Sequence, residues 1–228
     1  MLQYLRNRVV LILVASLFAV GACSADETAA KAAPREWVAG QDYFLIEPAQ
    51  PVTTGNKIEV LEIFSYACPH CAHFQPYAEE LKSKLPANAQ FGLLPAVFQP
   101  MWEPFARGFY AAKSLGLIDK THQALFDALH RDHQPLHTLE DLANLFYAKY
   151  GANSGSFLST ATSFVVEGEL ERGNDLVRAY HIDGTPSLVI NGKYRVTAIP
   201  DRGIAFPEMV QITLDLVKQE STAKKAKK

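Results

Sequence analysis

The spacing of apolar and polar residues predicts a strand, a helix and a pair of cysteines between them. Residues 57–66, KIEVLEIFSY, are nearly all apolar on both faces and rich in β-branched and aromatic side chains, as in a strand buried inside a sheet. The following residues, 68–85, have apolar side chains at helical spacing and stop before Pro86. Cys68 and Cys71 therefore lie at a predicted strand-to-helix junction.

The remaining pattern predicts further strands on either side of a long helical stretch. Residues 42–46 indicate an outer strand and residues 89–98 a second strand. Two short apolar runs flank Asn191 and Gly192, which is typical of a tight β-hairpin. The predicted helices are 103–116, 119–130, 138–151, 169–182 and 206–218. This order indicates an α/β fold interrupted by a block of helices.

The first residues have the layout of a bacterial export signal. Arg6 and Arg8 precede an apolar run at 9–20 that is too short for a membrane span, and small residues follow it. We assign 1–22 to this signal and 23–36, which lack apolar periodicity, to a flexible tether. The sequence VGAC at 20–23 resembles a lipobox, so Cys23 is a candidate lipidation site. Ordinary cleavage after Ala22 or Ala25 is the alternative, and both routes export the domain.

Charge and cysteine content narrow the function classes. The chain has 228 residues with 22 Lys and Arg against 24 Asp and Glu, so it is mildly acidic once the leader is removed, and nucleic acid is not an expected partner. The last residues, 221–228, form a basic tail. Without Cys23 a single cysteine pair remains, and a bridge between residues three apart in sequence closes too small a loop to stabilise a fold. The pair is therefore expected to be reactive.

Metal and haem are the alternative uses of this cysteine pair. A zinc site needs four ligands, and the chain has no second cysteine pair; His70 and His73 lie nearby but diverge from the cysteines on one helical turn. Covalent haem needs histidine where Ala72 stands. A metal-binding exported lipoprotein is kept as an alternative function, although we expect neither a metal nor another cofactor.

A redox role fits the local sequence better. Cys68 lies at the predicted helix N-terminus, where unpaired N–H groups and the helix dipole stabilise a thiolate. Pro69 suits the first helical position because it has no N–H to leave unpaired. His70 adds a hydrogen bond or positive charge near the same sulfur. A stabilised thiolate favours the reduced pair, so such a pair oxidises its substrates.

Other polar residues give weaker signals. Glu62 lies within the buried-strand pattern, so it must be paired, protonated, functional or turned toward a sheet edge. The histidines of HRDHQPLH, residues 130–137, favour a solvated turn between helices over a metal site. Met101 and Trp102 after the second strand fit either a partner groove or core packing.

Three stretches together resemble the bacterial DsbA family. They are EVLEIFSYACPHCAHF, the helical block and HIDGTPSLVINGKY, and the resemblance covers roughly residues 37–218. Members are periplasmic thiol:disulfide oxidases with a thioredoxin fold and an inserted all-helical domain. The resemblance implies a thioredoxin-like domain formed by 37–102 and 182–220, with the helical insertion at 103–181.

The resemblance also implies roles for individual residues. Cys68 would be the exposed attacking cysteine and Cys71 the buried resolving one. Pro186 would be a cis-proline facing the disulfide, and Thr185 would pair with an extended substrate segment. Glu62 would lie beneath the buried cysteine and move its proton.

The implied partners are unfolded exported proteins and a membrane reoxidase resembling DsbB, linked to quinone, and we expect a monomer. Two positions depart from the enterobacterial members. Leu93 faces Glu62 where those members have lysine, and Thr185 replaces their usual valine. Because threonine there is typical of isomerases and thioredoxins, a disulfide isomerase or reductase is the nearest alternative function.

Overall fold

The computed structural model describes residues 35–226, and the chain from Glu36 onward forms one compact unit. The predicted export signal at 1–22 and the candidate lipidation site Cys23 lie outside the described residues, as does nearly all of the tether. Within the described part, no helix is both long and apolar enough to cross a membrane.

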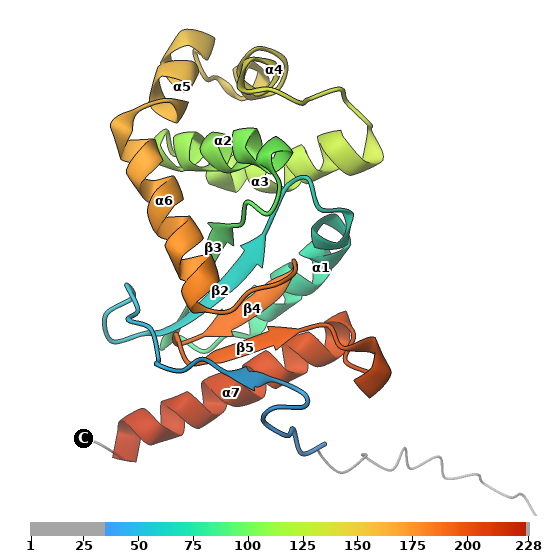
Figure 1. The fold of residues 1–228 in the computed structure, drawn as a ribbon, viewed down its shortest axis with the longest axis vertical. Coiled ribbons are helices and arrows are strands. Elements are labelled where there is room, and N and C mark those ends of the chain that lie inside the picture. Colours follow the sequence, from blue (N-terminus) through green and yellow to red (C-terminus); the bar gives the residue numbers. More distant parts are fainter. Residues whose placement is uncertain (1–34, 227–228) are drawn as a thin grey trace, which may run out of the picture. The chain divides into compact units, whose positions relative to one another are not determined.

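A five-stranded mixed sheet forms the centre of this unit, in the order β1-β5-β4-β2-β3 (Figure 1). β2 and β3 run parallel and the other neighbours run antiparallel. Six of the seven residues of β2 are buried, which explains its continuous apolar sequence. The strands are β1 (Phe44–Leu45), β2 (Ile58–Phe64), β3 (Ala89–Pro95), β4 (Ser187–Ile190) and β5 (Tyr194–Thr197).

Helices pack on both faces of the sheet. On one face, α1 (Pro69–Lys84) and α7 (Phe206–Ala226) share an apolar cluster with β2 and β4. On the other face, α6 (Phe164–Ala179) packs against β2, β3 and β4 through a second cluster that includes Ile63 and Val177. α7 extends beyond the predicted end at residue 218 because Glu220 is buried and hydrogen-bonded to the β4–β5 hairpin.

The segment between β3 and β4 is helical, as the sequence pattern predicts, but less regular. Its elements are η1 (Pro100–Trp102), α2 (Glu103–Ser114), α3 (Ile118–Phe126), the π-helical η2 (Asp127–Arg131), α4 (Leu139–Asp141), the π-helical η3 (Leu142–Phe146), η4 (Tyr147–Tyr150), α5 (Ser154–Ala161) and α6. The helix predicted over 138–151 is instead split into α4, η3 and η4, and α5 was not predicted. α6 begins at Phe164, before its predicted start at 169.

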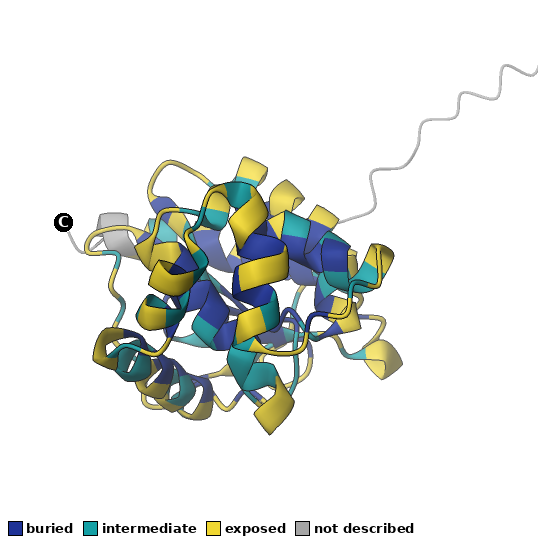
Figure 2. Ribbon diagram, turned by 90° about the horizontal axis from the view of Figure 1, so that it is seen from above, coloured by how far each residue is buried: buried dark blue, intermediate teal, exposed yellow. Residues whose placement is uncertain are grey.

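The helical segment and the end of the sheet share one continuous core. Aromatic rings of β2 and the residues after it pack against α2 and α3, with Phe64 in edge contact with Phe109 and Tyr66 packed on Phe126. Figure 2 shows the buried residues gathered in the interior beneath an exposed outer helical surface. The helical segment is therefore packed directly against the strand that leads to the cysteines.

The predicted hairpin is present between β4 and β5. Asn191 and Gly192 both have positive φ, 52° and 64°, the combination that a tight type I′ turn requires. A Cβ atom on Gly192 would lie 2.2 Å from the Gln50 carbonyl oxygen, so no side chain fits there. The close approach also ties the segment before β2 to the hairpin, through a hydrogen bond from Gln50 N to Gly192 O.

Candidate active site

The two cysteines lie where the sequence places them, between β2 and α1. Cys68 is the N-terminal cap residue of α1 and has an extended backbone, with Pro69 in the first helical position. Its carbonyl oxygen accepts hydrogen bonds from Cys71 N and Ala72 N, at 3.1 and 3.2 Å. The backbone N–H groups of His70 and Cys71 in this first turn also contact the Cys68 thiol.

Cys68 is more covered than the resemblance implies. It is 6% exposed, and Cys71 is fully buried; both are free thiols. The Cys68 sulfur lies 3.4 Å from the backbone oxygen of Thr185, so the loop before β4 lies against it and excludes most solvent. The expectation that Cys68 is exposed is therefore wrong for this structure, because the Thr185 loop packs against its sulfur.

The surroundings shift the pKa values of the two thiols in opposite directions. A hydrogen bond from the Cys71 thiol is the main cause that lowers the pKa of Cys68, to about 5, and it outweighs the effect of burial. Hydrogen bonds from Thr185 and from the backbone N–H groups of Cys71 and His70 lower this pKa further. Burial raises the pKa of Cys71 well above its usual range. Cys68 is therefore a thiolate at neutral pH, while Cys71 keeps its proton.

The loop before β4 forms the opposite side of the site. The Thr185–Pro186 peptide bond is cis, as the resemblance implies, and Pro186 is buried. β4 runs antiparallel to β2 with Ser187 opposite Ile63, so the start of β4 lies beside the end of β2. This register brings Thr185 next to Cys68 although the two residues are far apart in sequence.

Glu62 is fully buried, which rules out the sheet-edge alternative. Its neighbours in the sheet are Leu93 on β3 and Leu188 on β4, so the expected absence of a cation on the adjacent strand is observed. Gln75 Nε2 donates hydrogen bonds to Glu62 Oε1 at 3.1 Å and to the Cys71 carbonyl oxygen at 3.2 Å. This amide thus connects the carboxyl group to the buried cysteine.

Burial is the main cause that raises the pKa of Glu62, to about 7, and the positive charge of Lys82 and the Gln75 hydrogen bond oppose it. The carboxyl group therefore exchanges a proton near neutral pH. Sequence reasoning missed Gln75, although its position one helical turn after Cys71 is the signal that places it on the buried side of α1.

The remaining predicted residues at the cysteine turn are on the surface. Pro69, His70 and His73 are exposed, and His70 acts on Cys68 through its backbone N–H. Among residues 35–226, no three His, Cys, Asp or Glu side chains gather as ligands for a metal ion.

The two residues after β3 differ in their environments. Met101 is 68% exposed and thus not a core residue. Trp102 is half-buried and packs against the core, with its ring 5.7 Å from that of Phe98.

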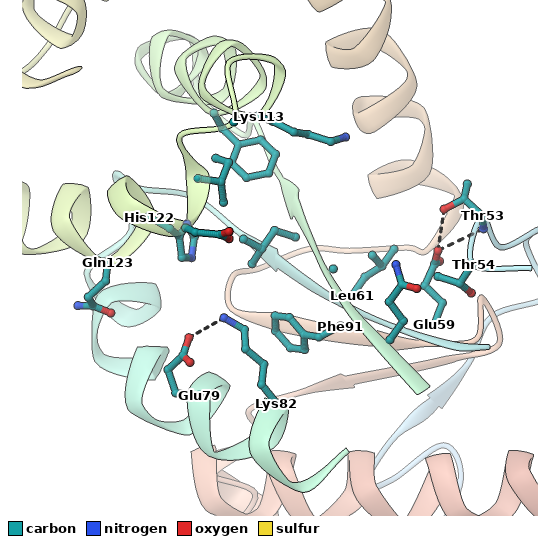
Figure 3. A pocket seen from close by; sticks show the side chains of 17 residues that line it. Thr53, Thr54, Glu59, Leu61, Glu79, Lys82, Phe91, Lys113, His122 and Gln123 are labelled. Carbon is teal, nitrogen blue, oxygen red and sulfur yellow. Dashed lines mark hydrogen bonds and ion pairs between the residues drawn. The ribbon is translucent and has the colours of Figure 1, made fainter. Parts of the chain in front are cut away.

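A groove of about 840 Å³ lies along β3, away from both cysteines (Figure 3). Lys82 of α1, His122 of α3 and Phe91 of β3 are among the residues that line it. Lys82 is held there by Glu79, and its ammonium group lies 4.9 Å from the centre of the Phe91 ring. Neither Cys68 nor Cys71 lines this groove, so it is not the redox site.

Comparison with known proteins agrees with this geometry. Residues 94–202 match the model of the DSBA-like thioredoxin domain. The thiol:disulfide interchange protein DsbA of Pseudomonas aeruginosa is 38% identical over 185 residues, 81% of this chain and 82% of the relative. The DsbA of Azotobacter vinelandii is 37% identical over 210 residues, 91% of this chain and 94% of the relative.

Solved structures show the same fold. The crystal structure of oxidoreductase DsbA from Xylella fastidiosa superposes with a TM-score of 0.77 at 35% identity and covers 82% of this chain and 100% of that one. The crystal structure of P. aeruginosa DsbA superposes with a TM-score of 0.76 at 36% identity and covers 83% of this chain and 97% of that one. The expected thioredoxin-like fold is thus confirmed, and the chain belongs to the DsbA family of thiol:disulfide oxidoreductases.

Proposed function

We propose that this protein donates disulfide bonds to exported proteins through Cys68 and Cys71. The observation that carries the proposal is the geometry of the pair: Cys68 caps the N-terminus of α1, Cys71 lies one turn later, and the cis Thr185–Pro186 bond lies beside the Cys68 sulfur. The lowered pKa of Cys68 and the raised pKa of Cys71 agree with this geometry. A thiolate that is stable at neutral pH favours the reduced enzyme, so the Cys68–Cys71 disulfide is a strong oxidant.

The cycle starts with the disulfide. A substrate thiolate attacks the Cys68 sulfur, the Cys68–Cys71 bond breaks, and the Cys71 sulfur leaves with the bonding electron pair. The Cys71 sulfur then takes up a proton, which we assign to the carboxyl group of Glu62 because its raised pKa lets it give up a proton near neutral pH. Gln75 holds this carboxyl group and the Cys71 backbone in place and does not itself transfer the proton. A second substrate thiolate then attacks the substrate sulfur of the mixed disulfide and releases Cys68 as a thiolate. The substrate loses two electrons, and the enzyme gains them.

Thr185 and Pro186 hold the substrate in this proposal. The Thr185 backbone oxygen lies 3.4 Å from the Cys68 sulfur, and we infer that an extended substrate segment pairs with the backbone of this residue. Pro69 and His70 complete the turn that carries the thiolate. The substrates are unfolded chains with free thiols.

We further infer a periplasmic monomer with the thioredoxin-like segments 37–102 and 182–220 and the insertion 103–181. Lipidation at Cys23 would attach it to the membrane. Because the enzyme leaves each cycle reduced, a DsbB-like, quinone-linked membrane protein is the inferred reoxidant.

The redox potential tests this function. We expect equilibration with glutathione to leave the enzyme largely reduced, and iodoacetamide to alkylate Cys68 half-maximally near pH 5, the pKa of its thiol. Cys68→Ser should abolish disulfide transfer to a reduced peptide. A potential near that of thioredoxin would contradict the oxidase and favour the isomerase or reductase that Thr185 suggests. Stoichiometric zinc retained through dialysis, with little disulfide transfer, would favour the metal-binding alternative.

A further inference from the structure

His130 differs from the other histidines of HRDHQPLH. We expected all three in a solvated turn, and His133 and His137 are indeed exposed. His130 is half-buried, and its Nε2 lies 2.7 Å from the backbone oxygen of Tyr66, two residues before Cys68. One histidine of this stretch therefore contacts the segment that leads to the active site.

The direction of this hydrogen bond follows from chemistry. A carbonyl oxygen can only accept, so His130 Nε2–H donates to Tyr66 O. Both the neutral tautomer with a proton on Nε2 and the imidazolium carry this donor. The contact therefore persists whether or not His130 is charged.

The Tyr66 side chain is held by the same helical segment. Its hydroxyl group lies 2.9 Å from His122 Nδ1 of α3, and both side chains are buried. Burial lowers the pKa of His122 to about 3, so this imidazole is neutral. Tyr66 is thus bound at its backbone by His130 and at its side chain by His122.

Tyr66 belongs to the short turn that joins β2 to α1. Within this turn Ala67 N donates to Ser65 Oγ at 3.2 Å, and Cys68 N donates to Ser65 O at 3.1 Å. The turn sets where the Cys68 sulfur lies relative to the N–H groups of α1. A contact that fixes the position of Tyr66 therefore also restrains the position of the Cys68 sulfur.

The local helix geometry supports a specific role for His130. Residues Asp127–Arg131 form a π-helical turn. Such turns are rare in proteins as a whole, and those that occur are often found at functional sites. This turn packs against α1, the helix that carries both cysteines. Within this turn His130 contacts Tyr66, whereas residues 131–133 are exposed.

We propose that His130 is a positioning residue for the redox site: with His122 it holds Tyr66 and thereby fixes the Ser65–Ala67 turn that places Cys68 at the N-terminus of α1. The inference rests on the proposed function, because it assigns His130 an effect on the reactivity of Cys68. On this proposal, the helical segment between β3 and β4 supports the active site through the contacts of His130 and His122 with Tyr66.

The test compares His130→Leu, which removes the donor, with His130→Gln, whose amide N–H restores one at similar reach. His137→Leu is the matched control, since His137 is an exposed histidine of the same stretch. For each variant and the wild type we would measure the Cys68 thiolate pKa by ultraviolet absorbance, the equilibrium constant with glutathione, and the thermal unfolding midpoint.

We expect His130→Leu to raise the Cys68 pKa and to make the enzyme less oxidising by about threefold to tenfold, the effect of losing one hydrogen bond of ordinary strength. His130→Gln should recover most of this loss, and His137→Leu should match the wild type. A lower unfolding midpoint with unchanged thiolate pKa and glutathione equilibrium would overturn the proposal and leave His130 a purely structural residue. A wild-type Cys68 with an ordinary pKa would instead overturn the proposed function.

Discussion

Glu62 keeps a carboxyl group in apolar surroundings next to the buried cysteine. Two leucines flank it in the sheet, and its pKa of about 7 lies above the usual 4.5, mainly because of burial. Between these two pH values the folded protein holds a proton that the unfolded chain releases. The contribution of Glu62 to the free energy of unfolding is therefore fully present below pH 4.5, its pKa in the unfolded chain. It is lost as the pH rises through about 7, its pKa in the folded protein.

Replacement of Glu62 by glutamine should remove this pH dependence. In the oxidised protein, where Cys68 does not titrate, we expect the wild type to lose up to about 3 kcal/mol of unfolding free energy as the pH rises from 4.5 to 7. The Glu62→Gln variant should lose less over the same range. Urea unfolding at several pH values measures this, with Glu80→Gln on the exposed side of α1 as the control. Parallel curves for wild type and Glu62→Gln would contradict the raised pKa.

The sequence predicts some of these residue-level features and not others. An acid within an apolar strand signals a special environment, and a cysteine followed by proline at a helix start signals a thiolate, because both signals are local. His130 gave no such signal, and the helical spacing of Gln75 indicates only that it lies on the buried side of α1. Their roles depend on which groups face them after folding, and Tyr66 O or Glu62 Oε1 cannot be located from spacing alone.

Among the elements, α7 and the β4–β5 hairpin depend on each other. Glu220 is 4% exposed and accepts hydrogen bonds from Asn191 Nδ2 at 2.6 Å, Lys193 Nζ at 2.7 Å and Tyr194 OH at 3.1 Å. Burial acts to raise the pKa of Glu220, but the bonds from Lys193 and Asn191 outweigh it and lower the pKa. A carboxylate near the end of the last helix thus holds the turn that follows β4.

Loss of this carboxylate should destabilise the fold. We expect Glu220→Ala to cost about 3 kcal/mol of unfolding free energy, because it leaves Asn191 and Lys193 without their buried acceptor. Gln219→Ala, a change at the exposed neighbouring position, should cost little. Chemical denaturation of both variants gives the comparison. Equal stabilities would mean that α7 is held by its apolar face alone.

Element prediction succeeded where a local signal exists. Asn191-Gly192 predicts its hairpin through turn chemistry, and Thr138 with Asp141 forms the capping box that starts α4. α5 has small polar residues and was missed; its Phe157 ring stacks 4.3 Å from that of Tyr147, so tertiary packing stabilises this helix. The same packing explains why 138–151 is not one regular helix.

For the whole molecule, oxidation state and folding are linked. The folded surroundings stabilise the Cys68 thiolate, and the unfolded chain offers no such stabilisation, so folding should favour the reduced pair. The order of strands and helices predicted this fold class, since each element has its own periodicity. The covering of Cys68 was not predicted, because it depends on the register between β2 and β4.

We therefore expect the reduced protein to unfold at higher denaturant concentration than the oxidised protein at neutral pH. Guanidinium titrations of both forms, followed by circular dichroism, measure the difference. In a Cys68→Ser, Cys71→Ser variant, reductant should make no difference. Greater stability of the oxidised form would indicate a structural disulfide and contradict the redox role.

The pairing of Ser187 with Ile63 has one more consequence. Thr185 lies outside the cysteine turn and reaches the Cys68 sulfur only through this register, so its share in lowering the Cys68 pKa is present only once the sheet is assembled. Incompletely folded copies should therefore have a less reactive Cys68 than the folded protein. Thiol reactivity at mildly acidic pH is then a direct chemical assay for correctly folded molecules in a mixed population.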